Sequence, residues 1–118
     1  MELIINGGEN MFYIDSETND LYLTRGDTAS LDLDLFIDDD PYTMVTGDKI
    51  VFSLRRNNDF NYACLNKEVT APHIDFVSDD TNNISLGEYD YSITMFYNDG
   101  NIDTFLTGKM HILGRCYE

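Results

Sequence analysis

The chain has 118 residues, with 22 Asp and Glu against 7 Lys and Arg, and therefore a formal charge of −15. Its length fits one compact domain, and its hydrophobic fraction of 42% is too high for a disordered acidic tail. The negative charge excludes nonspecific binding to nucleic acid or to an anionic membrane, because both require a basic surface. We expect a single domain over residues 1–118, with residues 1–10 forming a flexible or edge segment.

Alternation of apolar and polar residues with period two dominates the chain and predicts β-strands with one buried face. The pattern is clearest over residues 28–37, where an alanine and three leucines share one face and Ser30, Asp32 and Asp34 share the other. No stretch of helical length shows a 3.6-residue period. In chain order, the predicted strands are residues 11–14, 21–24, 28–37, 50–54, 62–66, 74–77, 89–95 and 102–112.

Turn residues separate these strands. An Asn-Asp turn is expected between the first two strands, and Thr46-Gly47-Asp48 precedes the strand at 50–54. Asp99-Gly100, flanked by two alternating runs, is the strongest short-range hairpin signal in the chain. In the last strand, Ile102, Thr104 and Leu106 are expected on one face, and the pattern continues through Met110 and Ile112.

About eight short strands at regular turn spacing predict an all-β fold, an Ig-like antiparallel β-sandwich of about 7–9 strands, with a small β-barrel as the alternative. Tyr89 follows Leu86-Gly87-Glu88 at the start of a late strand and resembles the tyrosine corner of Ig-like sandwiches. In those folds the Tyr hydroxyl binds backbone just upstream. Antibody domains have a Cys two residues later, where this chain has Tyr91, and the chain has no Trp, so the antibody core is absent.

The sequence offers few groups for catalysis. Only His73 and His111 could act as bases near neutral pH, and the chain has no Gly-x-Ser-x-Gly nucleophile elbow and no phosphate-binding glycine loop. A pair of carboxylates remains an open route to acid–base chemistry, although acidic residues on strands usually form the solvated face of a sheet. We expect a non-enzymatic protein without a cofactor. Cys64 and Cys116 are far apart in sequence and are expected to be free thiols, with a disulfide as the alternative.

Two short motifs have both a functional and a structural interpretation. Asp38, Asp39 and Asp40 are the best candidates for a calcium site, since hard cations bind oxygen-rich loops, but the run is also typical of a solvated turn. Asp79-Asp80 is a similar but weaker acidic pair. Arg25-Gly26-Asp27 matches a tripeptide that some adhesion receptors bind, but three residues carry little information, and a turn between two strands explains them.

Several aromatic residues fall on or near outward positions of the predicted strands. Exposed aromatic side chains mark protein contacts, although small sandwiches also cover strand ends with such rings. The interface candidates are Phe12, Tyr22, Phe36, Phe96 and Phe105.

Three segments of the chain occur in a recognisable order. They are Leu23-Thr24-Arg25-Gly26-Asp27-Thr28-Ala29 leading into Leu31-x-Leu33, then Gly47-Asp48-Lys49-Ile50-Val51-Phe52-Ser53-Leu54-Arg55, then Leu86-x-x-Tyr89-x-Tyr91-x-Ile93 followed by Asp99-Gly100 and Ile102-x-Thr104. This order resembles small tail and baseplate proteins of bacteriophages and prophages of Gram-positive bacteria, in particular the N-terminal Ig-like domain of upper baseplate proteins. The resemblance covers residues 20–113, and its motifs are structural rather than catalytic.

The resemblance implies a non-enzymatic structural or assembly protein of the virion, assembled in the bacterial cytoplasm. Residues 1–8 have no basic region and no apolar stretch of signal-peptide length, so no signal peptide is expected. The protein's partners would be other tail or baseplate proteins and further copies of itself, with no nucleic acid and no membrane. The alternative is a β-sandwich module that binds carbohydrate or a cell surface, with or without calcium. Because the acidic residues lie on the polar strand faces and in turns, a protein partner is expected to present a basic surface.

Overall fold

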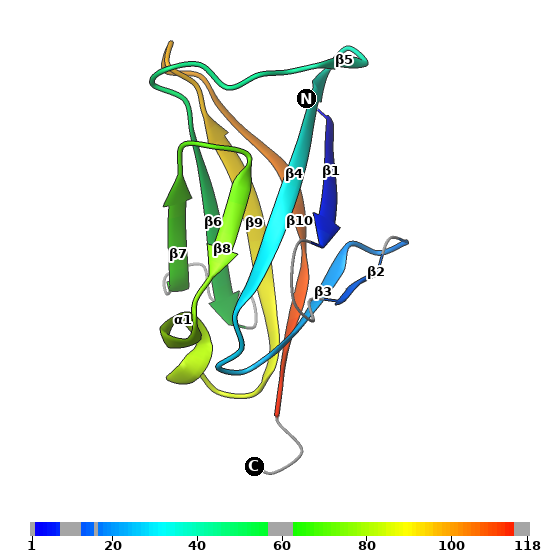
Figure 1. The fold of residues 1–118 in the computed structure, drawn as a ribbon, viewed down its shortest axis with the longest axis vertical. Helices are drawn as coiled ribbons and strands as arrows, with labels where there is room; N and C mark the ends of the chain where they lie inside the picture. The colour runs from blue at the N-terminus through cyan, green and yellow to red at the C-terminus, as the bar shows by residue number, and fades with distance from the viewer. Residues whose placement is uncertain (1, 8–12, 16, 57–62, 115–118) are drawn as a thin grey trace.

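The computed structural model describes residues 2–7, 13–15, 17–56 and 63–114, which form two β-sheets packed face to face (Figure 1). This confirms the expected all-β sandwich. The elements in chain order are β1 (Glu2–Gly7), β2 (Tyr13–Asp15), β3 (Asp20–Thr24), β4 (Ala29–Ile37), β5 (Asp40–Pro41), β6 (Lys49–Arg56), β7 (Ala63–Val69), β8 (His73–Phe76), α1 (Ser78–Asn82), β9 (Gly87–Phe96) and β10 (Ile102–Leu113).

The two sheets differ in size. The larger has six strands in the order β2-β3-β10-β9-β6-β7, and in the smaller one β4 pairs with β1, β5 and β8. All the pairs are antiparallel except β3 with β10, which is parallel. Strands β6, β9 and β10 follow the order of strands C, F and G of an Ig-like sandwich, and β4 pairs with β8 as B pairs with E. Both sheets are open at their ends, so the barrel alternative does not describe this fold.

The observed elements differ from the expected ones mainly at short strands and at the single short helix of the described residues. Strand β5 and the single-turn helix α1 were not predicted, and residues 2–7 of the N-terminal segment form β1 along β4. Residues 11, 12 and 62, which the alternation assigned to strands, lie outside the described residues. The expected Asn-Asp turn joins β2 to β3, with Asn19 at a φ of 61° and its N–H donating to the Asp15 carbonyl at 2.7 Å.

The tyrosine corner predicted from the sequence is confirmed. The Tyr89 hydroxyl donates to the Ser85 carbonyl oxygen at 2.6 Å, and the Tyr89 side chain is buried. The next inward residue of β9 is Tyr91, whose hydroxyl donates to the Asn19 carbonyl at 2.5 Å. The two tyrosines therefore attach β9 to the loop that precedes it and to the β2–β3 turn.

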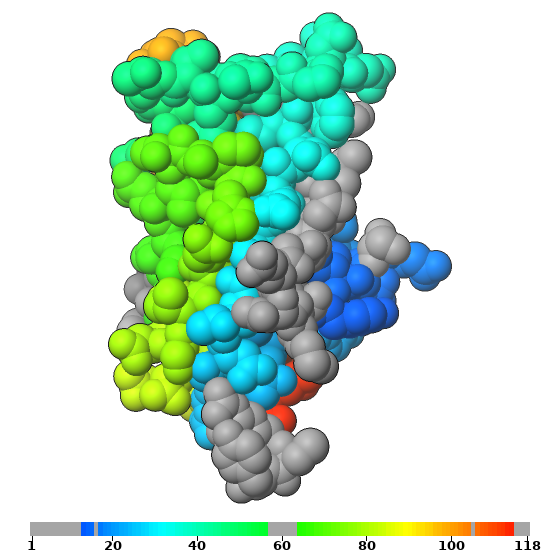
Figure 2. Space-filling view, viewed as in Figure 1, coloured from blue at the N-terminus to red at the C-terminus, as the bar shows by residue number. Residues whose placement is uncertain are grey.

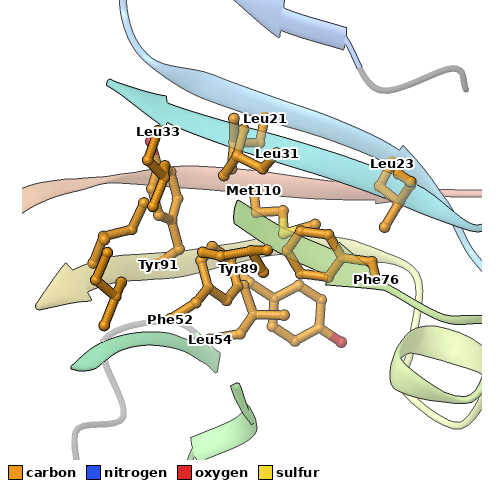
Figure 3. Close-up of a cluster of buried hydrophobic side chains, with 14 of the residues drawn as sticks. Leu21, Leu23, Leu31, Leu33, Phe52, Leu54, Phe76, Tyr89, Tyr91 and Met110 are labelled. Atoms are coloured by element: carbon orange, nitrogen blue, oxygen red, sulfur yellow. The ribbon is translucent and has the colours of Figure 1, made fainter. Parts of the chain in front are cut away.

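The core lies between the sheets and uses the faces that the alternation selected. Phe52 of β6 contacts Phe76 of β8 edge-to-face, with ring centroids 5.2 Å apart, and stacks on Tyr91 of β9 at 5.6 Å (Figure 3). Phe52 thus contacts side chains of both sheets. The buried hydrophobic residues are Leu21, Leu23, Ala29, Leu31, Leu33, Leu35, Ile50, Phe52, Leu54, Ile74, Phe76, Tyr89, Tyr91, Ile93, Met95, Met110 and Ile112.

The expectation for the last strand was wrong in one respect. The β9–β10 register shifts between Thr104 and Leu106, and this irregularity moves the following even-numbered residues to the other face. Ile102 is 65% exposed as a result, whereas Met110 is fully buried. The single face predicted from Ile102 to Ile112 is therefore two faces joined by a bulge.

Candidate functional site

The three aromatic interface candidates with described side chains, Tyr22, Phe36 and Phe96, do not form one patch. Tyr22 of β3 and Phe96 of β9 are half-buried on the outer face of the six-stranded sheet. They lie far apart, because Tyr22 is level with the start of β9 and Phe96 is at its end. Phe36 is half-buried on the four-stranded sheet. Lys49 lies over the Phe96 ring at 5.6 Å from its centroid. Phe12 and the side chain of Phe105 lie outside the described residues.

Tyr22 belongs instead to a small aromatic group at the β2–β3–β10 edge. Its ring is parallel to that of His111, with centroids 4.4 Å apart, and is tilted against Tyr13 at 5.4 Å. His111 Nε2 lies 3.3 Å from an Asp20 carboxylate oxygen, and its Nδ1 lies 4.0 Å from a Glu88 carboxylate oxygen. Burial, and then the charge of Asp20, raises the pKa of the Tyr22 hydroxyl. The group therefore links three strands of the sheet edge.

Charge is distributed unequally between the two sheets. The strands of the four-stranded sheet contain no Lys and no Arg, and the Lys and Arg of the described residues lie in β6, β7 and β10 or directly after β3. Figure 2 shows the face formed by β4 and β8, with the β4–β5 connection at one end. We define the acidic face by the carboxylates of these strands and their hairpin that have described side chains: Asp32, Asp34, Asp38, Asp39, Asp40 and Asp75.

His73 lies within the acidic face and connects strand β4 to strand β8. Nδ1 contacts the Asp32 carboxylate on β4, and Nε2 lies 2.6 Å from an Asp75 carboxylate oxygen on β8. Only a protonated imidazole can donate from both nitrogens, so the positive charge suits this position. The hydrogen bond with Asp32, followed by that with Asp75, raises the pKa of His73 above its ordinary value of 6.5. His73 therefore offsets part of the repulsion between neighbouring carboxylates.

The calcium candidates occupy a tight hairpin. Asp38 and Asp39 form the two-residue connection between β4 and β5, with Ile37 paired to Asp40. Their φ angles of 50° and 67° are the positive values that a type I′ turn requires. Among the residues that the structure describes, no group of three or more His, Cys, Asp or Glu is arranged to hold a metal ion. The backbone of the turn accounts for the acidic pair at its centre.

The Arg25-Gly26-Asp27 segment forms a turn between β3 and β4. Gly26 has a φ of 84°, is buried, and donates its N–H to the Thr81 hydroxyl of α1 at 2.8 Å. The Asp27 N–H closes the turn onto the Thr24 carbonyl at 3.0 Å. These bonds hold the tripeptide against the body of the domain, as expected for a structural turn.

The two candidate bases lie on opposite sheets, His73 on the outer face of β8 and His111 on the outer face of β10, so the fold does not bring them together. Each is paired with carboxylates from its own sheet. Asp80 of the weaker acidic pair accepts from Lys67 at 2.6 Å and from the Val77 N–H at 2.9 Å, and so fixes the start of α1. Cys64 is a half-buried free thiol, and Cys116 lies outside the described residues.

Sequence reasoning missed one buried polar centre. Asp48 is 2% exposed, and its carboxylate accepts from the Tyr42 hydroxyl, from the Val45 N–H at 3.1 Å and from the Asn98 N–H at 2.9 Å. The hydrogen bond with Tyr42 is the largest of the effects that lower the pKa of Asp48. The same hydrogen bond is the main reason why the pKa of Tyr42 is raised to about 12. Thr46-Gly47-Asp48 marks a turn in the sequence, but its link to the β9–β10 hairpin is visible only in three dimensions.

Comparison with protein-family models finds no match to this chain, and none of the curated proteins matches it in sequence. In the part of the chain that the structure covers, no helix combines the length and the apolar character needed to cross a membrane.

Proposed function

We propose that the chain is a non-enzymatic structural or assembly module of a bacteriophage or prophage tail or baseplate, and that it acts through protein–protein contacts of its acidic face. The observation that carries the proposal is the absence of Lys and Arg from all four strands of that sheet. The tail or baseplate identity rests on the sequence resemblance. A basic surface of another tail protein is the complementary partner, and the module works in the virion in several copies.

Electrostatics supports a basic partner over free self-association. Two separated copies repel each other because each carries a charge of −15. A partner with a basic surface is attracted over roughly one Debye length, about 10 Å at 0.1 M salt. Association through the acidic face is therefore fast at low salt and slows as salt is added. Copies of the chain are brought together by the shared partner.

The first test asks whether the protein is part of a particle. Phage particles are induced from the source strain, purified and analysed by mass spectrometry, with immunogold labelling of the tail. We expect the chain in the particles at a fixed ratio to the major tail proteins. Its absence from intact, infectious particles would contradict the proposal.

The second test concerns the surface. The proteins encoded by the neighbouring genes are purified, and their binding to the chain is measured by biolayer interferometry at increasing salt. Asp34→Lys reverses a charge on the acidic face, and Glu68→Lys makes the same change on an exposed residue of β7 in the other sheet. We expect Asp34→Lys to weaken binding by about tenfold or more and Glu68→Lys to change it little. Equal effects of the two variants, or binding insensitive to salt, would show that the acidic face is not the docking surface.

A further inference from the structure

The outer face of the six-stranded sheet contains a depression of about 440 Å³, on the opposite side of the sandwich from the acidic face. We propose that this depression binds a neutral saccharide. The inference does not depend on the tail or baseplate role, because it concerns a different sheet and a different ligand. The volume of the depression falls within the roughly 300–1,000 Å³ typical of small-molecule sites.

Strand register builds the depression from two parallel rows of side chains. Ser53, Ser92 and Thr107 are direct neighbours across β6, β9 and β10 and form a row of hydroxyl groups. The Ser53 hydroxyl donates to the Asn66 side chain at 2.7 Å, whereas the hydroxyls of Ser92 and Thr107 have no hydrogen-bond partner in the described part of the chain. Short side chains in the centre of a sheet face leave room for a ligand and offer it hydrogen-bonding groups.

The second row is charged and lies two residues further along each strand. Arg55, Asp90 and Lys109 are neighbours across the same three strands, and Lys109 forms an ion pair with Asp90. From strand geometry the two rows cover an area of roughly 7 Å by 10 Å. The long stems of Arg55 and Lys109 border the shorter hydroxyl row, which explains why the surface is hollowed here.

The floor of the depression is closely packed. Gly108 faces inward, where an added Cβ would lie only 2.8 Å from Cε2 of Tyr91 and 3.1 Å from the Asn19 carbonyl oxygen. The backbone at this point therefore packs directly on the Tyr91 ring, and Tyr91 is itself fixed by its bond to Asn19. A site on three adjacent, well-packed strands is formed before the ligand arrives, which reduces the entropy lost on binding.

Charge balance selects a neutral ligand. The whole molecule carries a charge of −15, so an anionic ligand is repelled on approach. At the depression itself Arg55 and Lys109 are balanced by Asp90 and by Glu88, whose carboxylate lies 3.8 Å from the Lys109 ammonium, so no local excess of charge favours an ionic ligand. A neutral sugar ring suits this lining. Its C–H faces can pack on the side-chain stems of Arg55 and Lys109. Its hydroxyls can donate to the Asp90 carboxylate and accept from Arg55 or Lys109.

The test is a titration of the isotope-labelled full chain, followed by amide NMR. The probes are neutral trisaccharides (maltotriose, cellotriose, mannotriose and tri-N-acetylchitotriose), with trigalacturonic acid as the anionic comparison and trilysine as the cationic one. We expect at least one neutral sugar to shift the amide signals of Ser53, Ser92 and Thr107 specifically. The absence of such shifts at millimolar sugar, or tighter binding of either charged probe in the depression, would overturn the proposal.

Variants make the test site-specific. Ser92→Leu fills the depression and is expected to reduce sugar affinity by about tenfold or more. Thr104→Leu places the same side chain on the same sheet outside the depression and is expected to bind sugar as the wild type does. Asp34→Lys on the acidic face should also bind sugar normally, so failure of the saccharide site and failure of the docking face can be told apart. Full affinity in a folded Ser92→Leu variant would refute the assignment of the site.

Discussion

Removal of one hydroxyl group from the tyrosine corner should measurably destabilise the domain. In Tyr89→Phe the ring is retained, and only the 2.6 Å hydrogen bond to the Ser85 carbonyl is lost. The net value of such a bond is about 1 kcal/mol, because Ser85 is exposed and water can replace the lost donor at its carbonyl. For 118 residues the unfolding entropy is about 0.25 kcal/mol/K, so the melting temperature should fall by about 4 °C.

The assay is thermal and urea unfolding followed by far-ultraviolet circular dichroism, because the chain has no Trp to serve as a fluorescent probe. The urea midpoint should decrease while the slope of the transition stays constant, since the surface exposed on unfolding is nearly unchanged. Tyr13→Phe is the matched control, because the Tyr13 side chain is 63% exposed, and it should stay within about 0.5 kcal/mol of wild type. If both variants were equally stable, the corner hydrogen bond would not stabilise the fold.

Two further variants test the packing and the charge of the sandwich. Gly108→Ala introduces a Cβ 2.8 Å from the Tyr91 ring. We expect the free energy of unfolding in urea to fall by about 1–3 kcal/mol, despite the entropic benefit of replacing Gly. A variant as stable as wild type would show that the ring can move away. The contacts with Asp32 and Asp75 raise the pKa of His73, so its stabilising contribution is complete below its unfolded pKa of about 6.5 and is lost as the pH rises through the folded value. The stability difference between wild type and His73→Gln should therefore decrease as the pH rises from about 5.5 to 8.5, and a constant difference across that range would contradict the ion-pair interpretation.

Features encoded by neighbouring residues could be predicted from the sequence. The inward faces of β4, β6 and β9 follow from simple alternation, and each is buried as expected. Tyr89 and the Asp99-Gly100 hairpin were recognisable because their partners lie within a few residues: the Gly100 N–H donates to the Tyr97 carbonyl at 3.0 Å. In these cases the local chemistry alone determines the geometry.

Features that depend on distant segments could not be predicted. The bulge in β10 has no signature in the sequence, because its effect is a change of register against β9. Burial of Asp48 requires Asn98, which comes from another loop, and the depression requires the lateral alignment of β6, β9 and β10. The acidic face depends likewise on the pairing of β4 with β8, which places Asp32 beside His73. Periodicity shows which side of a strand is polar, but it does not show which strands are neighbours.

The parallel pairing of β3 with β10 also constrains the order in which the domain can form. Leu21 pairs with Met110, so β3, near the start of the described residues, hydrogen-bonds to β10, the last strand among them. During synthesis on the ribosome, β3 must wait for nearly the whole described chain before this partner exists, and such long-range closure slows folding. An unpaired strand edge is prone to aggregation in that interval. Mutual repulsion between nascent chains, each rich in Asp and Glu, keeps them apart until β10 completes the sheet.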